Sequence, residues 1–101
     1  MNSAIETALT IAADHPAFAG HFPGDPIVPG VVLLDEALRV IDAATGIAHC
    51  GVAWVKFLRP VRPGASLLVR HAVEAGGAVG FEILLGADTI CTGRLDPPTA
   101  A

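Results

Sequence analysis

The sequence is poor in charged residues and in cysteine. Only 16% of its 101 residues are charged, while 52% are hydrophobic, which is apolar for a protein whose whole surface faces water. We therefore expect a second subunit to cover part of the apolar surface. The two cysteines, Cys50 and Cys91, are too few for a disulfide framework and lack the C-x-x-C spacing of a redox or zinc site. We assign them no chemistry.

The sequence also lacks a long hydrophobic run and an excess of positive charge. An apolar run such as residues 31–34 is far shorter than the roughly 20 residues that span a bilayer, so we expect no transmembrane helix. The first 16 residues have no basic segment and carry Glu6 and Asp14, which argues against a secretory signal and predicts a cytoplasmic protein. A net charge of −4 argues against nucleic acid as the main partner, because phosphate binding needs a basic surface.

The pattern of the chain predicts one α+β domain over residues 1–101, with a disordered tail at about 96–101. We expect a strand at 5–13, a proline-braced loop at 14–30, a helix at about 31–44 ended by Gly46, and strands at 51–58, 66–74, 79–85 and 89–95. Short glycine-bearing turns predict that the last four strands pair as an antiparallel meander packed on the helix. The residues expected on the core face of the helix are Leu33, Ala37, Val40, Ile41 and Ala44.

The stretch AGHFPGDPIVPGVVLLDEA, residues 19–37, places His21 and Asp35 on either side of a stiff corner. A histidine and a carboxylate form a candidate acid–base pair. Two plainer interpretations stay open: Asp35 forms a surface ion pair with Arg39, and His21 bonds nearby backbone. Gly30 likewise either lets the helix begin beside a proline or offers its N–H to a developing oxyanion. The apolar first turn, VVLL, indicates that something covers even the Asp35 side of the helix.

The segments GHFPGDPIVPGVVLLDEAL and VKFLRPVRPGASL closely resemble the hotdog-fold 3-hydroxyacyl-[acyl-carrier-protein] dehydratases, the FabA/FabZ group, over roughly residues 13–95. The resemblance implies an antiparallel sheet wrapped around one long central helix. It also implies a homodimer, or a higher or hetero-oligomer, joined through sheet edges. Carried over by position, the catalytic base is His21, the catalytic acid is Asp35 of the other subunit, and Gly30 binds the thioester carbonyl.

The implied reaction converts a 3-hydroxyacyl thioester on acyl carrier protein to the trans-2-enoyl thioester, in fatty-acid or polyene biosynthesis. His21 would remove a proton from C2, the Gly30 N–H would hold the carbonyl charge, and Asp35 would protonate or orient the departing hydroxyl. The reaction needs no metal or redox cofactor, because the phosphopantetheine arm belongs to the carrier substrate. A further likeness to small dehydratases of polyene-pigment gene clusters suggests an aryl or polyene acyl chain.

For several other residues, a functional role and a purely structural role both stay open. The candidate substrate-binding residues, which core packing would also explain, are Phe18, Phe22, Pro29 and Val31. Trp54 and Phe57 are similarly ambiguous. A cluster of basic residues is either a solvated turn or a docking site for the acidic carrier protein, and it consists of Lys56, Arg59 and Arg62.

Arg39 departs from the family pattern, in which glutamine is usual four residues after the acid. A guanidinium so close favours an ionised Asp35 and would weaken it as an acid. Two alternative functions therefore stay open. One is a hotdog thioesterase, in which the helix acid activates water, although such enzymes generally lack this loop. The other is a non-catalytic hotdog scaffold or acyl-binding subunit.

Overall fold

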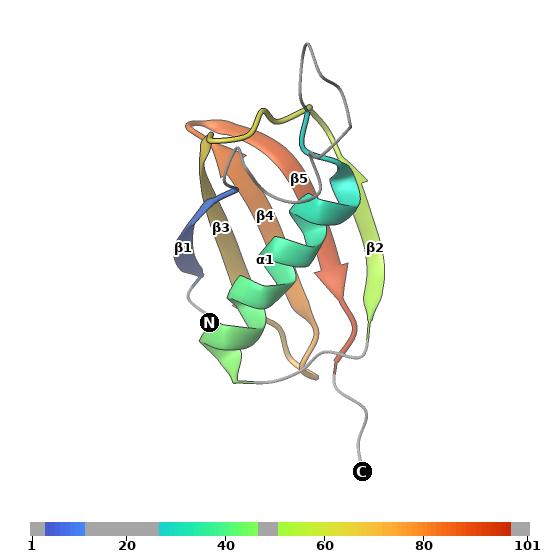
Figure 1. Ribbon diagram of the computed structural model, residues 1–101. Coiled ribbons are helices and arrows are strands. Elements are labelled where there is room, and N and C mark those ends of the chain that lie inside the picture. Colours follow the sequence, from blue (N-terminus) through green and yellow to red (C-terminus); the bar gives the residue numbers. More distant parts are fainter. Residues whose placement is uncertain (1–3, 12–26, 47–50, 98–101) are drawn as a thin grey trace.

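The computed structural model describes residues 4–11, 27–46 and 51–97. The elements within these ranges are, in chain order, β1 (Ile5–Thr10), α1 (Gly30–Thr45), β2 (Val52–Phe57), β3 (Ser66–Val73), β4 (Val79–Leu85) and β5 (Asp88–Leu95). Neighbouring strands are antiparallel and lie in the order β1-β3-β4-β5-β2. Figure 1 shows α1 crossing one face of the sheet, with β1 and β2 at the two edges. The predicted α+β architecture is confirmed.

Helix α1 begins and ends where its sequence dictates. Pro29, just before the first helical residue, has φ −58° and ψ 141°, and its carbonyl accepts hydrogen bonds from the N–H groups of Val32 and Leu33 at 3.0 and 3.1 Å. The helix ends at Gly46, whose φ of 70° suits glycine and whose N–H donates to the Asp42 carbonyl at 2.9 Å. The predicted helix at 31–44 is therefore correct to within one residue at each end.

The buried stripe of α1 consists of residues four positions apart: Leu33, Ala37 and Ile41. The expectation that Ala44 joins this core face is wrong, since Ala44 is exposed, whereas Val40 is partly buried and packs against the core as predicted. Ala44 lies in the last turn of the helix, where no described residue covers it. The core face of α1 therefore stops one turn before the helix does.

The sheet supplies the other half of the core. Val69, Ile83 and Cys91 lie opposite one another on β3, β4 and β5, and all three are fully buried. In β3 the burial alternates with the predicted period of two. In β4 and β5 a register shift between Ile83 and Leu84 interrupts the alternation, so that Ile90 and Cys91 are both buried. The apolar residues packed in this core are Leu9, Ile11, Val28, Leu33, Ala37, Ile41, Val61, Leu67, Val69, Val79, Phe81, Ile83, Ile90, Cys91 and Leu95.

The predicted four-strand meander is only partly correct. Strands β3, β4 and β5 pair in sequence, but β2 pairs with β5 at the far edge instead of with β3. The connecting segment 58–65 contains Pro60 and Pro63, which lack amide donors and do not fit a tight hairpin. It runs across the end of the sheet instead (Figure 1). There the Val61 carbonyl accepts a hydrogen bond from the Val28 N–H at 2.7 Å.

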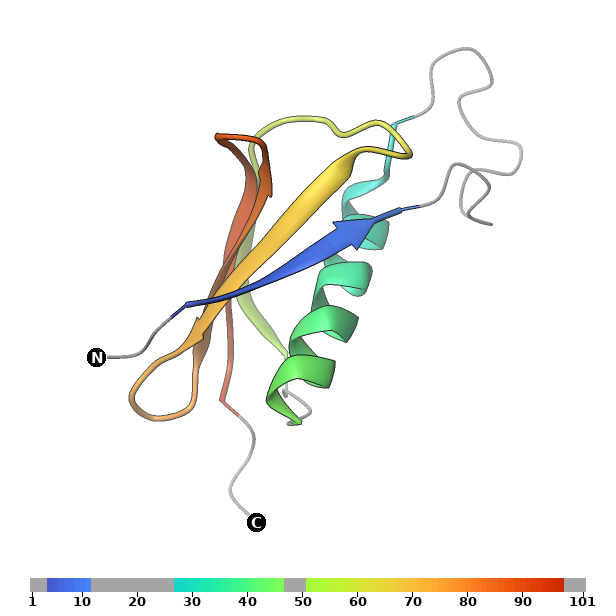
Figure 2. The ribbon, with the colours of Figure 1, turned by 90° about the vertical axis from the view of Figure 1, so that its left-hand side faces the viewer.

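A row of polar residues crosses the face of the sheet opposite α1. Figure 2 shows the helix on one side of the sheet only. The strand registers align one outward-facing residue from each strand in a single row: Glu6, Arg70, Glu82, Thr92 and Lys56. An ion pair of 2.8 Å joins Arg70 Nη2 and Glu6 Oε2 within this row. A single helix is therefore enough for this sheet, because the second face can lie in water.

Burial makes the Cys91 thiol inert. Its side chain has no exposed surface, and burial raises the pKa of the thiol from 9.0 to about 11. In a Cys50→Ser protein at pH 8, we expect iodoacetamide to alkylate Cys91 at least about a hundredfold more slowly in the native state than in urea, because burial both lowers the thiolate fraction and keeps the reagent from the sulfur. Mass spectrometry of timed samples measures both rates.

The same shift affects stability at alkaline pH. As the pH rises from 9 to 11, the unfolded chain loses a thiol proton that the folded chain retains, so the free energy of unfolding falls across this range. A Cys91→Ala variant, although less stable throughout, should lose less stability between pH 9 and 11. Equal alkylation rates in the two states would contradict the buried placement of Cys91.

Candidate active site

The start of α1 provides a backbone donor site. The first N–H groups of a helix have no partner within the helix and carry its positive end. Between described residues, no hydrogen bond engages the N–H of Gly30. The ring of Phe57, at the end of β2, lies so close that a Cβ at Gly30 would be 3.1 Å from its Cζ atom. A side chain at position 30 would therefore require the Phe57 ring to move by a few tenths of an ångström.

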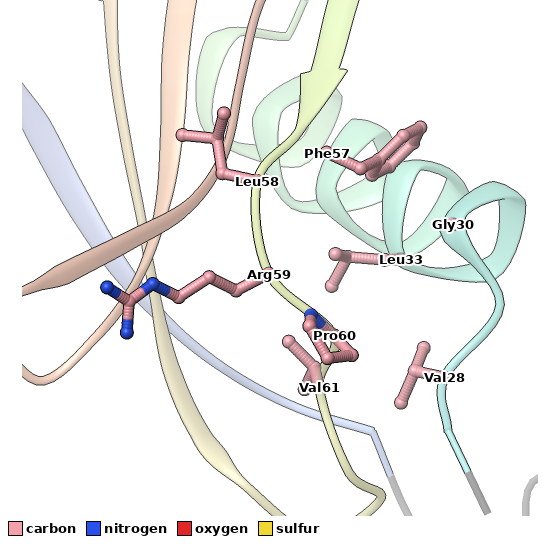
Figure 3. A pocket seen from close by; sticks show the side chains of 8 residues that line it. All are labelled: Val28, Gly30, Leu33, Phe57, Leu58, Arg59, Pro60 and Val61. Carbon is pink, nitrogen blue, oxygen red and sulfur yellow. The ribbon is translucent and has the colours of Figure 1, made fainter.

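An apolar cavity of about 310 Å³ opens beside Gly30. It lies between the start of α1 and the segment that follows β2, and the hydrogen bond from Val28 to Val61 holds these two segments together. Figure 3 shows the side chains around it, with the Arg59 side chain extending away from Gly30. The lining residues are Val28, Gly30, Leu33, Phe57, Leu58, Arg59, Pro60 and Val61. Such a cavity suits an apolar chain whose polar end reaches the Gly30 amide.

Asp35 lies on the outer side of α1 and does not line this cavity. Its Oδ2 accepts a hydrogen bond from Arg39 Nε at 3.2 Å, and the two side chains are 59% and 73% exposed. Val31, one turn earlier on the same side, is 73% exposed. The predicted ion pair between Asp35 and Arg39 is thus present. This side of α1 therefore exposes an apolar residue, Val31, in its first turn and charged residues, Asp35 and Arg39, in the turns that follow.

The three basic residues do not form one surface. Lys56 lies on the face of the sheet opposite α1, with its Nζ 5.9 Å from the centre of the Trp54 ring. Arg59 Nη1 donates to Asp88 Oδ2 at 3.5 Å, at the start of β5. Arg62 is exposed on the segment between β2 and β3. Three positions close in sequence are therefore spread over different sides of the molecule.

The structure brings some predicted site residues together and leaves others apart. Gly30 lines the cavity, whereas Pro29, Val31 and Asp35 do not. His21, Phe18 and Phe22 lie outside the described residues. Phe57, which the sequence left ambiguous between core and pocket, lines the cavity. The cavity residues that the sequence did not predict are Val28, Leu33, Leu58, Pro60 and Val61.

No described helix has the length and apolar character to cross a membrane. In the same part of the chain, no three side chains of histidine, cysteine, aspartate or glutamate gather in a way that could hold a metal ion.

Curated relatives of this chain are dehydratases. A FabZ 3-hydroxyacyl-[acyl-carrier-protein] dehydratase from Thermomicrobium roseum is 39% identical over 76 residues, covering 65% of this chain and 49% of that protein. The enzyme of the same name from Verminephrobacter eiseniae is 30% identical over an alignment of 115 positions including gaps, which covers 92% of this chain and 77% of that protein. This chain thus spans about half the length of the first relative and about three quarters of the second.

A solved structure and a family model give the same assignment. The structure is the dehydratase heterocomplex ApeI:P from Xenorhabdus doucetiae, with a TM-score of 0.79, 25% identity, and coverage of 95% of this chain and 88% of that chain. The predicted hotdog fold is thereby confirmed. The family model described as ApeI dehydratase matches residues 1–94. Because this match covers nearly all of the sequence, the chain belongs to the ApeI-like dehydratase family of hotdog proteins.

Proposed function

We propose that the protein dehydrates a 3-hydroxyacyl thioester carried on acyl carrier protein to the trans-2-enoyl thioester, in fatty-acid or polyene biosynthesis. The observation that carries this proposal is the apolar cavity beside the Gly30 amide, in a chain of a dehydratase family. The cavity would accept the apolar part of the substrate, and the start of α1 would bind the thioester carbonyl. An aryl or polyene acyl chain remains our more specific expectation for the substrate.

The chemistry requires three groups. His21 acts as the base that removes a proton from C2, which the neighbouring thioester carbonyl makes acidic. Negative charge then grows on the carbonyl oxygen, where the Gly30 N–H at the positive helix end stabilises it. Asp35 acts on the C3 hydroxyl as it leaves, either as proton donor or as orienting group. These steps need only proton transfers and hydrogen bonds, so we propose no metal or redox cofactor.

The position of Asp35 bears on the assembly. Since it lies on the exposed side of α1, a site formed within one chain would leave its carboxylate in water. We propose that a second copy of the chain pairs along the β2 edge and covers this side. Asp35 of one subunit and His21 of the other would then act on the same bound substrate. Exposed apolar residues at the beginning of α1 and along β2 support this arrangement: Val31, Trp54, Phe57 and Leu58.

Val31 offers a direct test of the dimer. Because its side chain is 73% exposed, Val31→Lys should change the free energy of unfolding of an isolated chain by less than about 0.5 kcal/mol. If a second subunit covers it, the lysine side chains must be buried, and we expect the variant to be a monomer without dehydratase activity. Light scattering after size exclusion gives the mass, and circular dichroism checks the fold.

Ala43→Lys is the matched control for Val31→Lys, because Ala43 is also exposed on α1 but lies three turns further along. It should remain dimeric and active. A parent protein that is monomeric at micromolar concentration, or a Val31→Lys variant that is dimeric and active, would contradict the homodimer. A parent that becomes dimeric only with a different chain would instead favour a heterocomplex, as described for the Xenorhabdus doucetiae protein.

The proposed reaction is tested by incubating the purified protein with a 3-hydroxyacyl carrier thioester and following the carrier by mass spectrometry. We expect the loss of one water from the parent reaction and a rate reduced about a hundredfold or more with Asp35→Asn. Released free carrier thiol would indicate the thioesterase. An unchanged substrate would support a second candidate, a non-catalytic acyl-binding subunit, which the salt bridge between Asp35 and Arg39 favours because it occupies one oxygen of the proposed catalytic carboxylate.

The carrier protein is also part of the proposal. Carrier proteins are acidic, and Arg59 is the residue of the predicted basic cluster that lies at the cavity, so we propose Arg59 as the docking contact, with Lys56 and Arg62 contributing only to the surrounding positive charge. Contacts of this kind mainly affect the rate and orientation of association. They would therefore show as a KM that rises with salt concentration, whereas kcat stays nearly constant.

A further inference from the structure

The ion pair between Asp35 and Arg39 has a geometry that bears on the reaction. Arg39 follows Asp35 by one turn of α1, so both side chains project from the same side of the helix. The bond from Arg39 Nε engages only Oδ2 of the carboxylate, at 3.2 Å. Between described residues, no hydrogen bond is made to Oδ1. One carboxylate oxygen is thus held by the protein while the other can accept a hydrogen bond from a bound molecule.

A hydrogen bond from a guanidinium fixes the orientation of a carboxylate and leaves its second oxygen available as an acceptor. The pair contributes little to the stability of the fold, because both partners are mostly exposed in the single chain. Its effect on the orientation of Asp35 is therefore the more important one.

We infer that Arg39 is a positioning residue that holds one oxygen of the Asp35 carboxylate, so that the other oxygen accepts a hydrogen bond from the C3 hydroxyl of the substrate. This inference rests on the proposed dehydration. The proton that leaves with the hydroxyl then comes from C2. The C2–H and C3–O bonds break, the C2=C3 bond forms, and the base passes its proton to the departing oxygen, which leaves as water. Asp35 orients the hydroxyl throughout.

The test compares Arg39→Gln with the parent in the dehydration assay between pH 6 and 9. We expect kcat to fall about tenfold with KM little changed, because the orientation of Asp35 matters in the transition state. The loss should be similar across the pH range, and Arg39→Lys, which keeps the charge, should restore part of the rate. In an Asp35→Asn background, Arg39→Gln should have no further effect, because Arg39 acts through Asp35.

Arg70→Gln is the matched control, since Arg70 is also an ion-paired arginine, bonded to Glu6 on the opposite face of the sheet. It should leave kcat unchanged, and both variants should melt within a few degrees of the parent. An Arg39→Gln variant that is faster than the parent, or whose activity extends to higher pH, would show that Asp35 must be protonated and would overturn the inference. Unchanged kcat in an active protein would also overturn it, whereas an inactive parent would refute the proposed dehydration and this inference together.

Discussion

Replacing His21 by alanine will lower kcat for dehydration by about a hundredfold to ten-thousandfold, the range over which a positioned general base contributes. The C2 proton of a thioester is acidic only because the carbonyl takes up the charge, and removing it at neutral pH needs a base that is largely unprotonated at that pH. Histidine meets this requirement, with an ordinary pKa near 6.5. The measurement is the rate of water loss from a 3-hydroxyacyl carrier thioester under single-turnover conditions.

The control for His21→Ala is His15→Ala, which removes another histidine of the same proline-rich segment. It should retain most of the parent activity. Substrate binding, measured by fluorescence anisotropy of a labelled carrier thioester, should be similar in the parent and in both variants, because His21 acts in the chemical step. Equal rates for His21→Ala and the parent would remove His21 from the mechanism and leave the cavity beside Gly30 without its base.

Replacing Ile41 by alanine will lower the free energy of unfolding by about 2–5 kcal/mol. Ile41 has no exposed surface and lies at the end of the buried stripe of α1, so the substitution removes buried methylene groups and leaves a void against the sheet. Urea unfolding followed by circular dichroism gives the value. Since Ile41 is distant from the cavity along the helix, activity per folded molecule should remain close to that of the parent.

Two further variants calibrate the Ile41 result. Ile41→Val removes a single methylene group and should cost only about 0.5–1.5 kcal/mol. Ala43→Ser, on the exposed side of α1, should change stability by less than about 0.5 kcal/mol. If Ile41→Ala costs no more than Ala43→Ser, then α1 does not pack on the sheet as described. In that case the position of Asp35 would have to be reconsidered as well.

Local patterns in the sequence predicted the elements well and their connections less well. The alternation in β3 and the glycine-bearing turns that flank β4 predicted the hairpins β3–β4 and β4–β5, because hairpin pairing depends only on neighbouring residues. The pairing of β2 with β5 joins distant parts of the chain, and hydrogen bonds from the N–H groups of Leu58 and Arg59 to the Ile90 carbonyl continue it just beyond β2. No local periodicity encodes such a contact.

The candidate site was predictable where it follows from a single element. The Pro29–Gly30 start of the helix and the spacing of Asp35 and Arg39 are local features, and the structure has both. Leu58 and Val61 could not be predicted as cavity residues, because they stand among prolines and basic residues, and their orientation depends on which strand β2 joins. The role of His21 remains a prediction from the family resemblance.

The contact between Gly30 and the ring of Phe57 predicts how these two positions vary among homologous sequences. A Cβ at position 30 would approach Phe57 Cζ to 3.1 Å, so a larger residue there requires the ring at the end of β2 to shift. Among homologous chains, a residue larger than glycine at position 30 should therefore occur more often together with a smaller side chain at position 57. Such covariation would link the amide that we propose as the thioester-binding donor to the aromatic wall of the cavity.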